Sequence, residues 1–77
     1  MKMFLLSDDL DILLGMRIVG VKGRYVESVR DFSDAFSEIV QDKEIGILVI
    51  TLSLSNECED IISPFKMNEQ PLIVLLD

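Results

Sequence analysis

The residues with the clearest chemical potential are two adjacent carboxylates near the N-terminus, Asp8 and Asp9. An acidic pair directly after a strand can bind Mg²⁺, as in phosphoreceiver domains. Such a domain also needs an acceptor aspartate at the end of the third strand and a lysine after the last strands. Here Thr51 occupies the acceptor position, and no lysine follows Lys66. The sequence therefore argues against an active receiver, and helix capping explains Asp8 better.

Other reactive groups lack the partners that their chemistry requires. Ser7 and Ser53 are conceivable nucleophiles, but the chain has no histidine and no glycine-rich elbow around either hydroxyl. The segment 20–23 superficially resembles a phosphate-binding loop, yet it follows a helix and lacks a third glycine. We expect a helix stop and a turn there. The single cysteine, Cys58, lies on an apolar helical stripe, which favours a buried packing role. We predict no catalytic residue, no cofactor and no metal site.

Composition indicates a small globular protein. The 77 residues are 49% hydrophobic and 27% charged, with a net charge of −7 that opposes the nucleic-acid backbone. The longest apolar runs, 45–51 and 71–76, are far shorter than the roughly 20 residues that cross a bilayer. No export signal or linker is recognisable. We therefore expect one domain, residues 1–77, in a reducing cytoplasm, with no nucleic acid and no direct membrane insertion.

Hydrophobic periodicity predicts strands and helices in strict alternation, four strands and three helices. The predicted strands are 2–6, an edge strand built on Tyr25, Val26 and Val29, then 45–50 and 72–76. The predicted helices are 10–19, 32–40 and a third that ends near Ile62 or Ser63. We expect helix 10–19 to be mostly buried and strands 45–50 and 72–76 to be buried as well.

This alternation predicts an α/β fold with a small doubly wound, mostly parallel four-stranded sheet. Right-handed crossovers favour the strand order 2-1-3-4 with helices on both faces, a Rossmann-like or receiver-like arrangement. Such a sheet places its functional loops at the carboxyl ends of the strands. The predicted loops are Ser7 to Asp9 and Thr51 to Ser55.

Three sequence blocks match a known family in order and spacing. Residues 1–8 and 15–23 are similar to a strand, Ser-Asp, and then Gly-Leu-Arg-Leu-Ala-Gly-Ile-x-Gly. Residues 42–51 are similar to Asp-x-x-Ile-Gly-Ile-Leu-Leu-Ile-Thr, and residues 71–74 to Pro-Leu-Ile-Val. These blocks span nearly the whole chain. On them, the sequence resembles the F subunit of the V-type (archaeal and bacterial A/V-type) rotary ATPases.

The resemblance implies a mechanical role. It describes a non-catalytic central-stalk protein that docks on the coiled-coil D subunit of a proton- or sodium-translocating V-type ATPase or ATP synthase. Through the D subunit it would connect the catalytic A/B ring to the membrane rotor, coupling ATP hydrolysis or synthesis to ion transport. The implied location is cytoplasmic and peripheral on the membrane. A degenerate receiver-like signalling or interaction domain, without a phosphoacceptor, is the alternative.

Two departures from the family pattern bear on contacts with partners. Family members usually continue about one helix beyond the Pro-Leu-Ile-Val strand, whereas this sequence ends at Asp77. Leu13 and Leu14 replace positions that are often polar, which is consistent with extra burial or with an added contact. The candidate contact residues are Arg17, Arg24, Tyr25 and Val26, facing an acidic or apolar stripe on a partner helix. Arg17 also suits the helix dipole, and Tyr25 also suits a covering role over the core.

Overall fold

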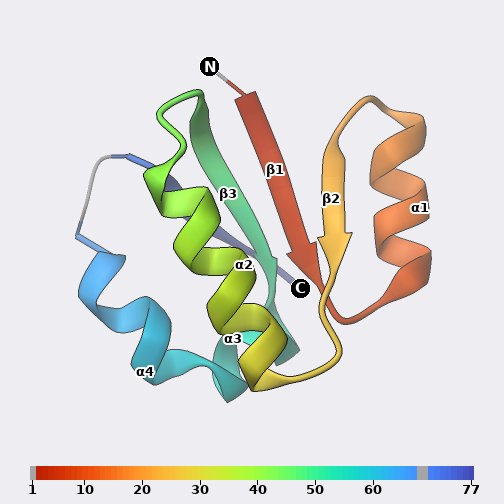
Figure 1. Cartoon of the computed structure of the whole chain (residues 1–77). Coiled ribbons are helices and arrows are strands. Elements are labelled where there is room, and N and C mark those ends of the chain that lie inside the picture. The colour runs from red at the N-terminus through yellow and green to blue at the C-terminus, as the bar shows by residue number, and fades with distance from the viewer. Residues whose placement is uncertain (1, 68–69) are drawn as a thin grey trace.

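Strands and helices alternate along the chain and build one parallel sheet with helices on both faces (Figure 1). This computed structural model describes residues 2–67 and 70–77. The elements are β1 (Lys2–Ser7), α1 (Leu10–Ile18), β2 (Lys22–Tyr25), α2 (Val29–Gln41), β3 (Ile45–Thr51), α3 (Leu52–Glu57), α4 (Glu59–Ile62), the 3₁₀ helix η1 (Ser63–Phe65) and β4 (Leu72–Leu76). The strands are parallel, in the order β2-β1-β3-β4. The predicted α/β class and the predicted order 2-1-3-4 are confirmed.

The larger core lies between the sheet and helices α2, α3 and α4. Helix α2 begins after its N-cap Ser28, whose Oγ accepts a hydrogen bond from the Asp31 backbone N–H at 3.1 Å. Its apolar residues recur with helical spacing and therefore share the face that meets the sheet. The buried members of this core are Leu6, Val26, Phe32, Ala35, Phe36, Ile39, Ile45, Leu48, Ile50, Leu54, Cys58 and Ile62. The predicted helix 32–40 and central strand 45–50 are thus confirmed.

Helix α1 packs on the opposite face of the sheet, over β1 and β2. Successive side chains of a strand point to opposite faces, so Leu5 points away from the core that contains Leu6. Leu5 pairs with Gly23 of β2. A Cβ atom added at Gly23 would lie 2.6 Å from Leu13 Cδ2 and 2.9 Å from the Leu5 carbonyl oxygen. Leu13 of α1 therefore rests on the Leu5 side of the sheet, and the missing side chain at Gly23 permits this approach.

Helix α1 is not the mostly buried helix that its apolar composition predicts. None of its nine residues is buried, and Leu10, Leu14 and Ile18 are 58%, 62% and 86% exposed. The helix covers the β1–β2 side of the sheet, and no other element among the described residues packs above it. Only the stripe that carries Leu13 and Met16 is therefore partly covered.

The second strand begins earlier than its β-branched and aromatic residues predict. Val26 follows the end of β2, and Val29 already belongs to α2. The turn expected at residues 20–23 is shorter than predicted, because Gly23 already lies within β2. Gly20 makes the turn and adopts a φ of +94°. Parallel pairing with β1 along the length of β2 sets this register.

The third predicted helix forms as two short helices. Helices α3 and α4 meet at Cys58, whose backbone N–H bonds to the Leu54 carbonyl oxygen at 3.0 Å. The 3₁₀ helix η1 follows and contains Pro64, the residue expected to stop the helix. Cys58 is 2% exposed and packs in the core, as its place on an apolar stripe predicts.

The fourth strand is exposed, although its unbroken apolar run predicts burial. Leu72, Val74 and Leu75 are 52%, 42% and 43% exposed. The reason is position, because β4 pairs only with β3 and forms the edge of the sheet. A run of apolar residues looks the same in sequence whether one or two layers cover it.

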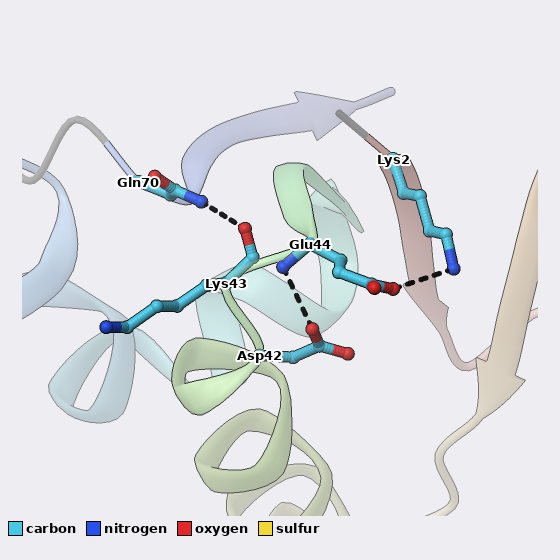
Figure 2. Close-up of polar contacts among 5 residues, drawn as sticks. All are labelled: Lys2, Asp42, Lys43, Glu44 and Gln70. Atoms are coloured by element: carbon cyan, nitrogen blue, oxygen red, sulfur yellow. Dashed lines mark hydrogen bonds and ion pairs between the residues drawn. The ribbon is translucent and has the colours of Figure 1, made fainter.

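Polar contacts tie the amino end of the sheet together (Figure 2). Lys2 Nζ lies 2.9 Å from Glu44 Oε2, and the Glu44 backbone N–H donates to Asp42 Oδ1 at 2.9 Å. The side-chain amide of Gln70 donates to the Lys43 carbonyl oxygen. The turn before β3 is therefore linked to both β1 and the segment before β4. The ion pair is about two-thirds exposed, so it adds little stability.

Candidate functional site

Asp8, Thr51 and Ser53 meet at the carboxyl edge of the sheet, where β1 and β3 end side by side. Thr51 Oγ1 donates a hydrogen bond to Asp8 Oδ1 at 3.2 Å, and Ser53 Oγ donates to the same oxygen at 3.3 Å. Thr51 is 3% exposed and stands where a phosphoreceiver carries its acceptor aspartate. The arrangement therefore binds one carboxylate with two hydroxyls, and the residue opposite Asp8 at the end of β3 is a threonine in place of an acceptor carboxylate.

The residue that caps α1 is Asp9, and the prediction that Asp8 has this role is wrong. Asp9 Oδ1 accepts hydrogen bonds from the backbone N–H groups of Asp11 at 2.9 Å and Ile12 at 3.4 Å. Ser7 Oγ in turn accepts from the Asp9 backbone N–H at 2.9 Å. Asp8 is turned towards β3 instead. Both members of the acidic pair are thus engaged in contacts that shape the loop.

A cleft of about 340 Å³ lies above this edge, lined among others by Asp8, Leu76 and Asp77. Within residues 2–67 and 70–77, no three carboxylate, thiol or imidazole groups are placed to hold a metal ion. Burial raises the pKa of the Cys58 thiol, and the negative charges of Glu57 and Asp8 raise it further. The thiol is therefore kept protonated, the form that is poorly nucleophilic.

The four residues predicted to contact a partner do not form one surface. Arg17 lies exposed in the last turn of α1. Arg24 reaches towards α2, where its Nη1 lies 3.1 Å from Glu38 Oε2. Tyr25 is 41% exposed, whereas Val26 is 1% exposed within the core and offers no side-chain surface. A contact role for these residues stays a prediction.

Sequence reasoning missed the exposed apolar residues of α1 apart from Leu14, for which it left extra burial or an added contact open. Helix α1 presents Leu10, Leu14 and Ile18 at positions i, i+4 and i+8, which lie along one side of a helix. Val19, the C-cap residue that follows α1, is also apolar and is 72% exposed. Burying a side chain of this size contributes about 1.5–3 kcal/mol. Covering this row with another molecule would therefore lower the free energy of the complex.

A second apolar surface lies on the sheet beside α1. The strand register places Met3, Ile47 and Leu72 in one row, and Val74 follows in the next row beside Val49. Met3, Leu72 and Val74 are 41%, 52% and 42% exposed. These residues alternate along their strands with members of the core, so they point to the side that carries α1. We call the surface formed by Met3, Ile47, Leu72 and Val74 the open sheet face.

Topology was the signal that could have revealed the open sheet face. In the order 2-1-3-4, the connections from β2 to β3 and from β3 to β4 run in the same direction, so right-handed crossovers place their helices on one face. The connection from β1 to β2 runs the other way and places α1 on the opposite face, where no other helix of residues 2–67 and 70–77 packs. A nine-residue helix cannot cover four strands. Exposure therefore follows from strand order, and hydrophobicity alone does not reveal it.

These features define the chain as a small parallel α/β domain with exposed apolar surfaces, a class that includes many components of protein assemblies. The family model described as ATP synthase (F/14-kDa) subunit matches residues 3–77. The chain belongs to this family and is an accessory component of a rotary ATPase, which confirms the predicted relation to the F subunit of V-type ATPases. A search of curated proteins gave no match. In the described part of the chain, every helix is too short or too polar to cross a membrane.

Proposed function

We propose that this chain is the non-catalytic central-stalk subunit of a V-type proton- or sodium-translocating ATPase or ATP synthase. It docks on the coiled-coil D subunit and turns with it. Through that contact it connects the catalytic A/B ring with the membrane rotor, so that ATP hydrolysis or synthesis is coupled to ion transport. The observation that carries the proposal is the family match over residues 3–77.

The chemistry of the surface supports a docking role. Protein interfaces are anchored by large apolar side chains that lose water on binding. The chain exposes such side chains on α1 and on the open sheet face. At the carboxyl edge, the groups that resemble a receiver site are engaged in hydrogen bonds between Asp8 and the hydroxyls of Thr51 and Ser53. A protein that transmits torque needs apolar side chains that anchor it to its partner, and it does not need a reactive group of its own.

The proposal includes the organisation and location of the protein. Residues 1–77 act as one domain, and this domain lies at the cytoplasmic surface of the membrane as part of the complex. A net charge of −7 favours a basic protein partner over nucleic acid or an anionic lipid surface. Contact with the membrane rotor is therefore made through the D subunit.

Co-expression with the D subunit of the same organism tests the proposal. Size-exclusion chromatography with light scattering then counts the chains in any complex. We expect a stable one-to-one heterodimer, and we expect none with an unrelated coiled coil of similar length and charge, which serves as the control. A chain that elutes alone in both mixtures would contradict the proposal.

The alternative is a degenerate receiver-like signalling domain, favoured by the position of Thr51 opposite Asp8. It predicts no complex with the coiled-coil partner. It also predicts that replacing Thr51 with aspartate restores Mg²⁺ binding, because a second carboxylate would then stand beside Asp8. Isothermal titration of the Thr51→Asp variant with MgCl₂ checks this outcome, with the unsubstituted chain as its control.

A further inference from the structure

The uncovered part of the open sheet face, over β3 and β4, is about as wide as one helix. Helices α2, α3 and α4 pack on the other side of the sheet, and α1 lies over β1 and β2. Within the described residues, the α1 side of β3 and β4 is therefore left without a helix (Figure 1). Neighbouring strands lie about 4.8 Å apart and a helix with its side chains is about 10 Å wide, so one helix covers about two strands.

The open sheet face is apolar along the strands and acidic at one end. Its rows contain no charged residue between Met3 and Val74. At the carboxyl end, Leu76 lines a cleft together with Asp8 and Asp77. At the amino end, Lys2 is neutralised by its ion pair with Glu44. A ligand that complements this surface is therefore apolar along its length and positively charged at one end.

We infer that the open sheet face binds an amphipathic helix of the coiled-coil partner, packed beside α1 with its basic end at Asp8 and Asp77. This inference rests on the proposed function, in which the partner is a coiled coil and so presents helices. The apolar stripe of the helix covers Met3, Leu72 and Val74. The basic end lies over the cleft at the carboxyl edge and orients the helix along the strands.

Charge favours this occupant over a second copy of the chain. Two copies would bring together surfaces of molecules that each carry a net charge of −7. A basic helix instead lowers the electrostatic free energy of the acidic rim. The apolar rows are the same for either occupant, so the rim at Asp8 and Asp77 is the feature that discriminates between them.

Two adjacent residues of β4 provide a matched test. Val74 is 42% exposed on the open sheet face, and Leu75 is 43% exposed on the opposite face of the same strand. Val74→Asp places a carboxylate under the docked helix, whereas Leu75→Asp places one outside the interface. We expect Val74→Asp to weaken binding to the D subunit by at least about tenfold, the scale of a central interface residue. Leu75→Asp should change the affinity by less than about threefold.

The effect of each substitution on folding is measured separately from its effect on binding. Circular dichroism and a urea titration establish whether each variant is folded, and calorimetric titration with the D subunit gives the dissociation constant. If Val74→Asp does not fold, Leu72→Gln tests the same face, because Leu72 is more exposed at 52%. Loss of affinity in the folded variant of the open sheet face, with affinity retained in Leu75→Asp, supports the inference.

Two other outcomes overturn it in distinguishable ways. If the unsubstituted chain binds the coiled-coil partner and Val74→Asp and Leu72→Gln bind equally well, the proposed function stands and the docking surface lies elsewhere. If the unsubstituted chain shows no binding to this partner, the proposed function and this inference both fail. Light scattering of the chain without its partner completes the test. If the unsubstituted chain is a dimer and the Val74→Asp variant is a monomer, the open sheet face binds a second copy and the inference is wrong.

Discussion

Gly23 is the residue that lets α1 approach the sheet. A Cβ atom at this position would lie 2.6 Å from Leu13 Cδ2 and 2.9 Å from a backbone oxygen of Leu5. The backbone cannot move away cheaply, so Gly23→Ala should lower the free energy of unfolding by about 1–3 kcal/mol through overpacking. Urea denaturation measures this change.

Gly15 supplies a control for that substitution. It lies in the middle of α1, and a Cβ atom added there meets nothing within 4 Å. Gly15→Ala should therefore raise stability by about 0.5–1 kcal/mol, because alanine favours a helix more than glycine does. Equal effects of the two substitutions would show that α1 does not rest on Gly23.

Cys58 should react only when the protein opens. Burial raises the pKa of its thiol, with Glu57 and Asp8 as lesser causes. Modification by a thiol reagent at pH 8 should be roughly a hundredfold slower in the native protein than in urea, as for an opening free energy of about 3 kcal/mol. Equal rates in both states would contradict a buried thiol.

The raised pKa of Cys58 also makes the stability of the protein depend on pH. Above about pH 9 the unfolded thiol ionises while the folded thiol stays protonated, so the native state binds more protons than the unfolded state. Stability should consequently fall as pH rises through this range. The comparison is with a Cys58→Ala variant, which lacks the titrating group and should lose less stability over the same pH interval.

At the scale of elements, the start of α1 depends on Asp9. Its carboxylate accepts hydrogen bonds from two backbone N–H groups of the first turn. Asp9→Ala should lower the free energy of unfolding by about 1 kcal/mol, and Asp9→Asn should lower it less, because asparagine also caps helices. Thermal unfolding followed by circular dichroism measures both. Equal losses in the two variants would mean that capping is not what Asp9 contributes.

The same elements show how far sequence patterns reach. Helix α2 and strand β3 are predicted correctly because one has a clear 3.6-residue period and the other is a continuous apolar run between polar turns. The register of β2 is not predicted, because pairing with β1 overrides the low strand propensity of Lys22 and Gly23. The burial of α1 and β4 is overestimated, because composition records apolar residues and does not record how many layers cover them.

For the whole molecule, the candidate surface was the least predictable part. Sequence reasoning selected Arg17 of the first helix and the edge-strand residues Arg24, Tyr25 and Val26, because they could meet an acidic or apolar stripe on a partner helix. The open sheet face joins Met3 of β1 to Leu72 of β4, residues far apart in the chain. Only the strand order brings them together. They are exposed because, among the described helices, only α1 packs on their face of the sheet, and it lies over β1 and β2.

The net charge of the whole chain, −7, affects how fast the protein associates with a basic partner. Its attraction for a basic partner is screened by salt, with a Debye length of about 10 Å at 0.1 M ionic strength. The association rate constant with the coiled-coil partner should therefore fall as ionic strength rises, while the dissociation rate constant, set by apolar contacts, changes little. Stopped-flow mixing over a range of NaCl concentrations measures the association rate.

A pair of variants with equal charge change locates the effect. Asp77→Asn removes a charge from the cleft at the carboxyl edge, whereas Asp34→Asn removes one from an exposed position of helix α2 on the other side of the sheet. If the basic end of the partner helix lies at this cleft, Asp77→Asn should slow association more and should make its salt dependence shallower. Identical behaviour of the two variants would mean that only net charge steers the encounter, and the orientation assigned to the helix would then be wrong.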